Sequence, residues 1–169
     1  MACVHSKVHC DPDPPISVSK KTILVLGIGN LMLGDEGVGI HAIRALKEMK
    51  VPENVEVVDG GTGGFELLMY FRGKKKVIII DAMNGDAEPG MVFRCLPNDL
   101  DLKWRHPYSS HQSTITELLY FATLESPSLE IVLFGIVPEI IHEASTELSR
   151  VIQDRIPQLI SAVWREIHS

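Results

Sequence analysis

The segment most informative about the fold of this 169-residue chain is residues 23–39, ILVLGIGNLMLGDEGVG. The apolar run over residues 22–27 is typical of a strand buried on both faces of a sheet. A glycine-rich loop follows and carries Asp35 and Glu36, and helical spacing of apolar residues then extends over 36–49. Ligands of α/β proteins bind at the carboxyl ends of strands, so the two acids are expected at the mouth of a sheet.

The rest of the chain continues this alternation of strands and helices. Further strands are predicted over residues 55–58, 77–80, 91–96 and 129–137, although the pattern leaves the direction of 91–96 open. Further helices are predicted over residues 65–71, from Ser109 or Ser110 to Leu124, and over 145–167. This order predicts an α/β fold, a three-layer sandwich on a mostly parallel sheet.

Composition excludes several functional classes. The net charge of −6 argues against nucleic acid as a partner, because phosphate binding favours a basic surface. No apolar run approaches the roughly 20 residues of a membrane span, and the first twenty residues lack the apolar core of a signal peptide. The odd count of three cysteines predicts reduced thiols and a cytoplasmic protein.

Domain organisation is expected to be simple. Residues 1–20 are predicted to form a disordered leader, because the run DPDPP at 11–15 holds neither a helix nor a central strand. Residues 21–169 are predicted to form a single domain, a size that buries a real core. The leader contains four residues that could form a soft-metal cluster, although incidental cysteines and histidines in a disordered tail are the preferred explanation: Cys3, His5, His9 and Cys10.

Two enzyme classes fit the sequence poorly. In a dinucleotide-binding motif that begins at Gly27, the third glycine falls on Met32, and two acids stand where a pyrophosphate needs positive potential. A serine hydrolase needs a nucleophile elbow, whereas Ser109 and Ser110 beside His111 look like helix-capping residues. Cys95 lies in an apolar strand pattern that is typical of a buried core thiol.

A metal site is the stronger hypothesis. Glu36 follows the first predicted strand, Asp81 ends the third, and His111 begins a helix that reaches the same edge of the sheet. Two carboxylates and an imidazole suit a borderline divalent ion such as nickel or zinc, with coordination positions left for water or substrate. Taken singly, each residue has a structural explanation, as a turn cap, a first-turn acid or a surface histidine.

Two loops are candidates for substrate contact. The segment DGGTGG at 59–64 exposes backbone N–H groups and admits a peptide closely, or else it is only a tight strand-to-helix turn. The irregular segment 97–110, with Trp104 and Tyr108, is long enough to clamp a substrate or to pack on the surface.

The sequence resembles the hydrogenase maturation endopeptidases, which process the large subunit of [NiFe] hydrogenases. The resemblance runs from about Thr22 to the last helix and includes, in order, LVLGIGNL at 24–31, GDEGVG at 34–39, VDGGT at 58–62, IIDA at 79–82, HQ at 111–112 and LFGIVPE at 133–139. It implies a three-layer α/β/α sandwich on a mixed five-stranded sheet. It also implies that Glu36, Asp81 and His111 contact the metal and carry catalysis.

The resemblance further implies a nickel-dependent endopeptidase that removes the C-terminal extension of the nickel-loaded large-subunit precursor. The nickel is then presented by the precursor, and Asp59, Gly60, Gly61 and Thr62 are assigned to substrate binding. Either the ion activates the scissile carbonyl or a water, or Asp81 or Glu36 acts as general base on a water. A non-catalytic nickel-binding maturation scaffold is the alternative, and a monomer is preferred.

Overall fold

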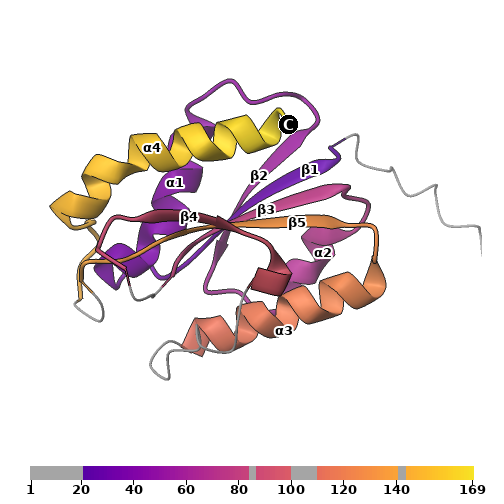
Figure 1. Ribbon diagram of the computed structural model, residues 1–169, viewed down its shortest axis with the longest axis horizontal. Coiled ribbons are helices and arrows are strands. Elements are labelled where there is room, and N and C mark those ends of the chain that lie inside the picture. The colour runs from indigo at the N-terminus through magenta and orange to yellow at the C-terminus, as the bar shows by residue number, and fades with distance from the viewer. Residues whose placement is uncertain (1–20, 84–86, 100–109, 141–143) are drawn as a thin grey trace, which may run out of the picture.

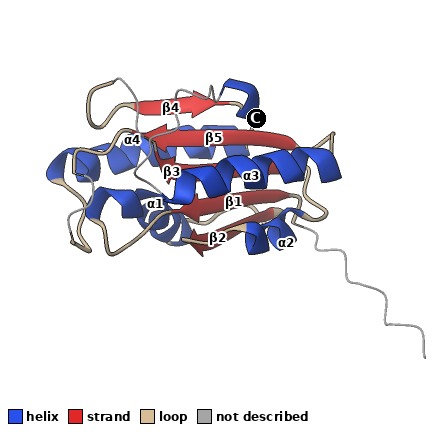
Figure 2. Ribbon diagram, turned by 90° about the horizontal axis from the view of Figure 1, so that it is seen from below, coloured by secondary structure: helices blue, strands red, loops and turns tan. Residues whose placement is uncertain are grey.

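The computed structural model describes residues 21–83, 87–99, 110–140 and 144–169. Its centre is a five-stranded sheet in the order β2-β1-β3-β5-β4. The strands β2, β1, β3 and β5 are parallel, whereas β4 at the edge is antiparallel to β5 (Figure 2). The bounds are β1 Ile23–Ile28, β2 Val55–Gly61, β3 Lys76–Ala82, β4 Val92–Cys95 and β5 Glu130–Ile136.

Helices cover both faces of this sheet. The α-helices α1 and α4 lie on one face, and α2 and α3 lie on the other (Figure 1). Their bounds, with the short 3-10 helices η1 to η3, are η1 Gly34–Gly37, α1 Val38–Lys47, η2 Phe65–Leu67, α2 Leu68–Phe71, η3 Pro97–Asp99, α3 Ser110–Glu125 and α4 Arg150–Ile167. The three-layer α/β/α sandwich on a mixed, mostly parallel sheet is therefore confirmed.

The central strand β3 shows why the sheet is buried on both faces. Its side chains alternate, so that Ile78 and Ile80 join the core beneath α1 and α4, while Val77 and Ile79 join the core beneath α2 and α3. All four are fully buried. A continuous apolar run in the sequence therefore becomes a strand that serves two hydrophobic cores.

Two of the predicted helices are longer than the helices in the structure. The helix predicted over 145–167 begins at Arg150, because Ser149 is its N-cap and accepts a hydrogen bond from the Ile152 N–H through its side chain. Ser145 instead forms an isolated bridge with Leu33. The helix predicted over 36–49 starts as η1 and ends at Lys47.

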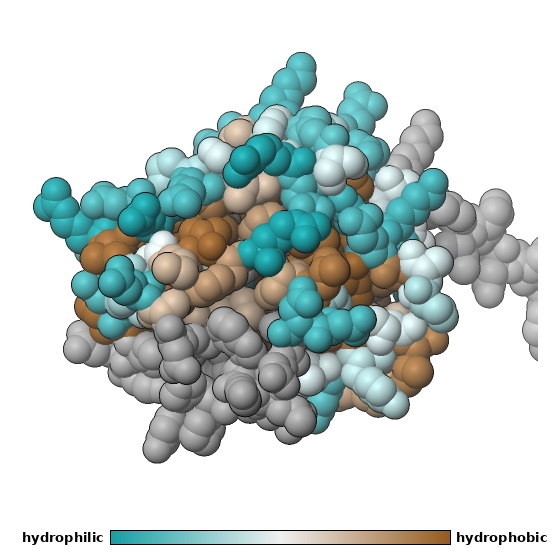
Figure 3. Space-filling model, in the orientation of Figure 1, coloured by the Kyte–Doolittle hydropathy of each residue, from teal (hydrophilic) through white to brown (hydrophobic). Residues whose placement is uncertain are grey.

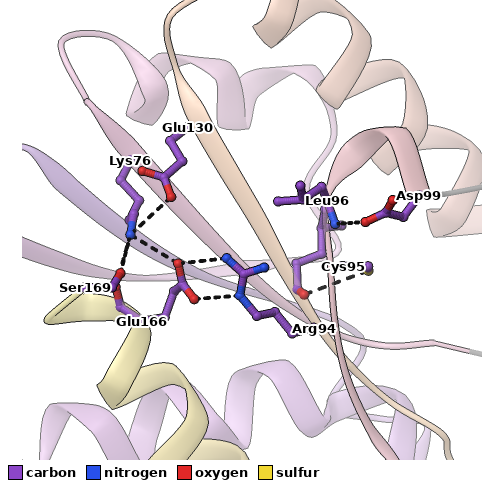
Figure 4. A network of polar contacts seen from close by, with 9 residues as sticks. Lys76, Arg94, Cys95, Leu96, Asp99, Glu130, Glu166 and Ser169 are labelled. Atoms are coloured by element: carbon purple, nitrogen blue, oxygen red, sulfur yellow. Dashed lines mark hydrogen bonds and ion pairs between the residues drawn. The ribbon is translucent and has the colours of Figure 1, made fainter.

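A polar network joins the sheet to α4 at the amino end of β3. The Lys76 ammonium contacts Glu166 at 3.1 Å and Glu130 at 3.2 Å, and it donates to the Ser169 hydroxyl at 2.7 Å (Figure 4). Arg94 on β4 donates to both carboxylate oxygens of Glu166, at 2.7 and 3.2 Å. The network fixes the last turn of α4 at the end of the sheet opposite to Asp81.

The surface over the antiparallel edge is partly apolar. Hydrophilic residues cover the upper part of the face in Figure 3, where α4 lies, and hydrophobic ones gather below it along β4. Met91 and Leu96, which flank β4, are exposed. No helix within the described ranges is long and apolar enough to cross a membrane. The predicted leader, residues 1–20, lies outside the described residues, and the division into a leader and one domain stays a prediction.

Candidate functional site

The two predicted acids come from neighbouring parallel strands. Glu36 lies in η1, which follows β1, and Asp81 is the second-last residue of β3. The strands β1 and β3 are paired in register, with Gly27 opposite Ile80, so their carboxyl ends meet at one edge of the sheet. The structure thus brings Glu36 and Asp81 to the same edge, as the parallel topology requires.

The carboxyl group of Asp81 is buried, and its pKa is shifted from the ordinary value. Its residue is 8% exposed, and burial raises the pKa of its carboxyl well above the usual range. The Ala82 N–H donates to Asp81 Oδ1 at 2.8 Å and opposes that rise in pKa, whereas the negative charge of Glu36 adds to it. The two acids therefore repel one another in a buried setting that favours a bound proton or a cation.

Two glycines allow the acid-bearing loop to approach the strands. Gly29 has φ of 144°, and a Cβ there would collide with the Glu36 carbonyl oxygen, which accepts from the Asn30 N–H at 3.1 Å. A Cβ at Gly39 would collide with the carbonyl oxygens of Ile28 and Ile80. These glycines therefore pack η1 and α1 directly against the ends of β1 and β3.

His111 is the second residue of α3, and its side chain lies outside the described residues. The 16-residue helix is about 24 Å long, close to the roughly 23 Å of the seven-residue strand β5 that follows it. Because α3 runs back along the sheet, it begins at the carboxyl edge, as Figure 2 shows. The histidine backbone is thus placed at the end of the sheet that carries the acids.

No group of three metal-binding side chains gathers among the residues with described side chains. The His111 imidazole is not among those side chains, so the predicted trio of Glu36, Asp81 and His111 stays a prediction. Trp104 and Tyr108, the predicted clamp residues, also lie outside the described residues.

Asp35 is buried and accepts three backbone hydrogen bonds, a role that the sequence did not predict. Its residue is 1% exposed, and its Oδ2 accepts from the N–H groups of Glu139 and Ile140, at 3.0 and 2.9 Å. Its Oδ1 accepts from the Ser149 N–H at 2.7 Å. Asp35 therefore holds the β5–α4 connection to η1, a contact between residues more than a hundred positions apart for which the sequence has no local signal.

The glycine loop after β2 lies beside the acid loop. The Gly29 N–H donates to the Gly61 carbonyl at 2.9 Å, and the exposed Asp59 accepts from the Gly61 N–H at 3.0 Å. The Gly63 N–H closes a turn onto the Gly60 carbonyl at 2.9 Å. These bonds show the tight turn, while the predicted role of Asp59, Gly60, Gly61 and Thr62 in substrate binding stays a prediction.

Cys95 fits a structural thiol. It is half-buried at the end of β4, its sulfur contacts the Leu133 carbonyl at 3.9 Å, and burial raises the pKa of its thiol. A raised pKa keeps the thiol protonated, which disfavours a nucleophilic role.

Comparisons with known proteins agree with this geometry. A sequence model described as HycI, hydrogenase maturation protease, matches residues 40–166. The hydrogenase 2 maturation protease of Escherichia coli is 30% identical over 148 residues, which cover 83% of this chain and 90% of that protein. The solved structure of the hydrogenase maturating endopeptidase HybD from E. coli has 28% identity and a TM-score of 0.78, with 86% of this chain and 91% of that chain covered. HybD from Thermococcus kodakarensis has 26% identity and a TM-score of 0.71, with 86% and 98% covered.

Proposed function

Because this chain belongs to the hydrogenase maturation protease family and is therefore a peptidase, we propose that it is a nickel-dependent endopeptidase. Its substrate is the nickel-loaded precursor of a [NiFe] hydrogenase large subunit, from which it removes the C-terminal extension. The observation that supports this proposal best is the electrostatically coupled pair of acids, Glu36 and Asp81, at the carboxyl edge of the sheet.

The donor chemistry fits a borderline divalent ion. Glu36 and Asp81 supply carboxylate oxygens, and His111, at the start of α3, supplies an imidazole in this proposal. Nickel arrives on the precursor as part of the substrate. A divalent cation beside the two acids offsets both the burial of Asp81 and its repulsion from Glu36, so a loaded precursor binds more tightly than an empty one.

Cleavage of the peptide bond then needs a water molecule and a base. Either the ion polarises the scissile carbonyl or the water, or one of the two carboxylates takes the proton of the attacking water. The glycine turn at residues 59–63 lies beside the acid loop and is proposed to receive the backbone of the precursor tail. We propose that the protein acts as a monomer in the cytoplasm.

The direct test is mass spectrometry of a matched large-subunit precursor before and after incubation with the protein, with and without nickel. The wild-type protein is expected to shorten only the nickel-loaded precursor, and the Asp81→Asn and Glu36→Gln variants are expected to leave it intact. Asp154→Asn is the matched control, because Asp154 is an exposed carboxylate on α4. Binding without shortening by the wild-type protein would instead support the nickel-binding scaffold.

A further inference from the structure

We propose that Asp35 is the positioning residue for Glu36 and, through it, for the acid pair. This inference rests on the proposed function. The side chain of Asp35 is buried in the protein, where three backbone N–H groups bind it at 2.7 to 3.0 Å. It acts by fixing η1 against the β5–α4 connection, of which residues 137–140 and 144–149 are described.

Burying the Asp35 carboxylate costs free energy, so its position depends on the hydrogen bonds that it receives there. A carboxylate that is 1% exposed is strongly destabilised unless hydrogen bonds replace its water. Here both oxygens accept from backbone N–H groups, which are charge-assisted bonds of good length. Because the donors are backbone N–H groups, they cannot rotate with the carboxylate as side-chain donors could, and they hold it in one position.

The same loop is held at a second point. The Gly34 N–H donates to the Ser145 carbonyl at 2.7 Å, and the Ser145 N–H donates to the Met32 carbonyl at 3.1 Å. The backbone before Asp35 is thus tied to the connection by main-chain bonds, and the Asp35 side chain adds the next tie along the chain. Together they prevent η1 from sliding along the connection or rotating about its own axis.

Rotation of η1 is the motion that matters for Glu36. Asp35 and Glu36 are consecutive in a 3-10 helix, which has about three residues per turn, so their side chains leave the axis about 120° apart. When Asp35 is fixed toward the connection, Glu36 is directed elsewhere by a set angle. That angle sets where the Glu36 carboxylate lies relative to Asp81 at the carboxyl edge of the sheet.

A matched pair of variants at Ser149 separates positioning from simple anchoring. Ser149 has φ of −56°, which proline adopts, and Ser149→Pro removes the N–H that binds Asp35 Oδ1. Ser149→Ala keeps that N–H. Both variants lose the side-chain cap on Ile152, so the difference between them reports what happens when the N–H that binds Asp35 is replaced by the proline ring carbon, which also pushes the carboxylate away.

The experiment measures kcat and KM for cleavage of a nickel-loaded precursor at a temperature where circular dichroism shows both variants to be folded. Ser149→Pro is expected to lower kcat at least fivefold relative to Ser149→Ala, with KM within twofold, and Asp35→Asn is expected to lower kcat further if it folds. Equal kcat values for the two Ser149 variants would overturn the proposal, because a mere anchor affects stability alone.

Crystal structures of the two Ser149 variants give a readout that needs no activity. The Glu36 side chain is expected to move relative to Asp81 in Ser149→Pro and to keep its place in Ser149→Ala. An unmoved Glu36 in both would overturn the positioning role. If the wild-type protein does not shorten the nickel-loaded precursor, the proposed function fails, and these structures still decide the role of Asp35.

Discussion

The Gly39→Ala variant is expected to separate the two acids while leaving the protein folded. A Cβ at this position would collide with the carbonyl oxygens of Ile28 and Ile80, which are backbone atoms that no side-chain rotation can move. Relief therefore requires α1, and η1 before it, to shift away from the ends of β1 and β3. That shift carries Glu36 away from Asp81.

The expected change in the free energy of unfolding is the difference between two opposing effects of the Gly39→Ala substitution. Overpacking a tight site costs about 1–3 kcal/mol, and the rigid backbone contacts place this variant near the upper end. Replacing glycine by alanine in a helix stabilises the folded state by at most about 1 kcal/mol. The net loss of about 2 kcal/mol lowers the thermal midpoint by about 4–8 °C for a chain of this length and leaves a protein of ordinary stability folded.

Activity is expected to fall far more than stability. A displacement of about 1 Å at a catalytic centre costs on the order of a hundredfold in rate. Val163→Ala is the control, because Val163 is fully buried near the opposite end of the sheet and its truncation costs a comparable free energy of unfolding. Thermal unfolding and precursor-cleavage rates are compared for both variants. If Gly39→Ala cleaves as fast as Val163→Ala at equal stability, the close approach of α1 does not control the site.

Two further predictions concern pH. The raised pKa of Asp81 means that, between the unfolded value near 3.9 and the raised folded value, the folded protein keeps a proton that the unfolded chain releases, so stability falls as pH rises through that window. Metal-free Asp81→Asn should therefore unfold at a higher temperature than wild type at pH 7, and a lower midpoint would contradict the burial argument. Glu166 gives the opposite pH dependence of stability, because Arg94 first, and then Lys76, lower the pKa of its carboxyl. The stability that this shift provides is fully present above the unfolded value of about 4.3 and is lost as pH falls through the folded value. Denaturant unfolding at pH 7 should show a loss of about 1.5–3 kcal/mol in Glu166→Gln, because Lys76 then keeps only the half-exposed Glu130 as a carboxylate partner. The difference from wild type should shrink toward pH 3, and a difference independent of pH would refute the role of the charge.

The sequence predicts those parts of the fold that depend on local pattern. The apolar runs of β1 and β3 and the glycines between β1 and α1 are enough to place Glu36 and Asp81 at one edge, because parallel strands end together. The predicted start of α4 was wrong, because Leu148 fits the apolar spacing of the helix, whereas in the structure the backbones of Ser145 and Ser149 bind the loop around Asp35. The role of Asp35 was not predictable for the same reason, since its three donors come from a segment that only tertiary folding brings near.

The most direct measurement is anomalous X-ray diffraction at the nickel edge from crystals of the protein bound to a nickel-loaded precursor. One nickel peak is expected within coordination distance of the Glu36 and Asp81 carboxylates and the His111 imidazole. A nickel peak that none of these side chains reaches, or one contacted by a different set of residues, would contradict this expectation.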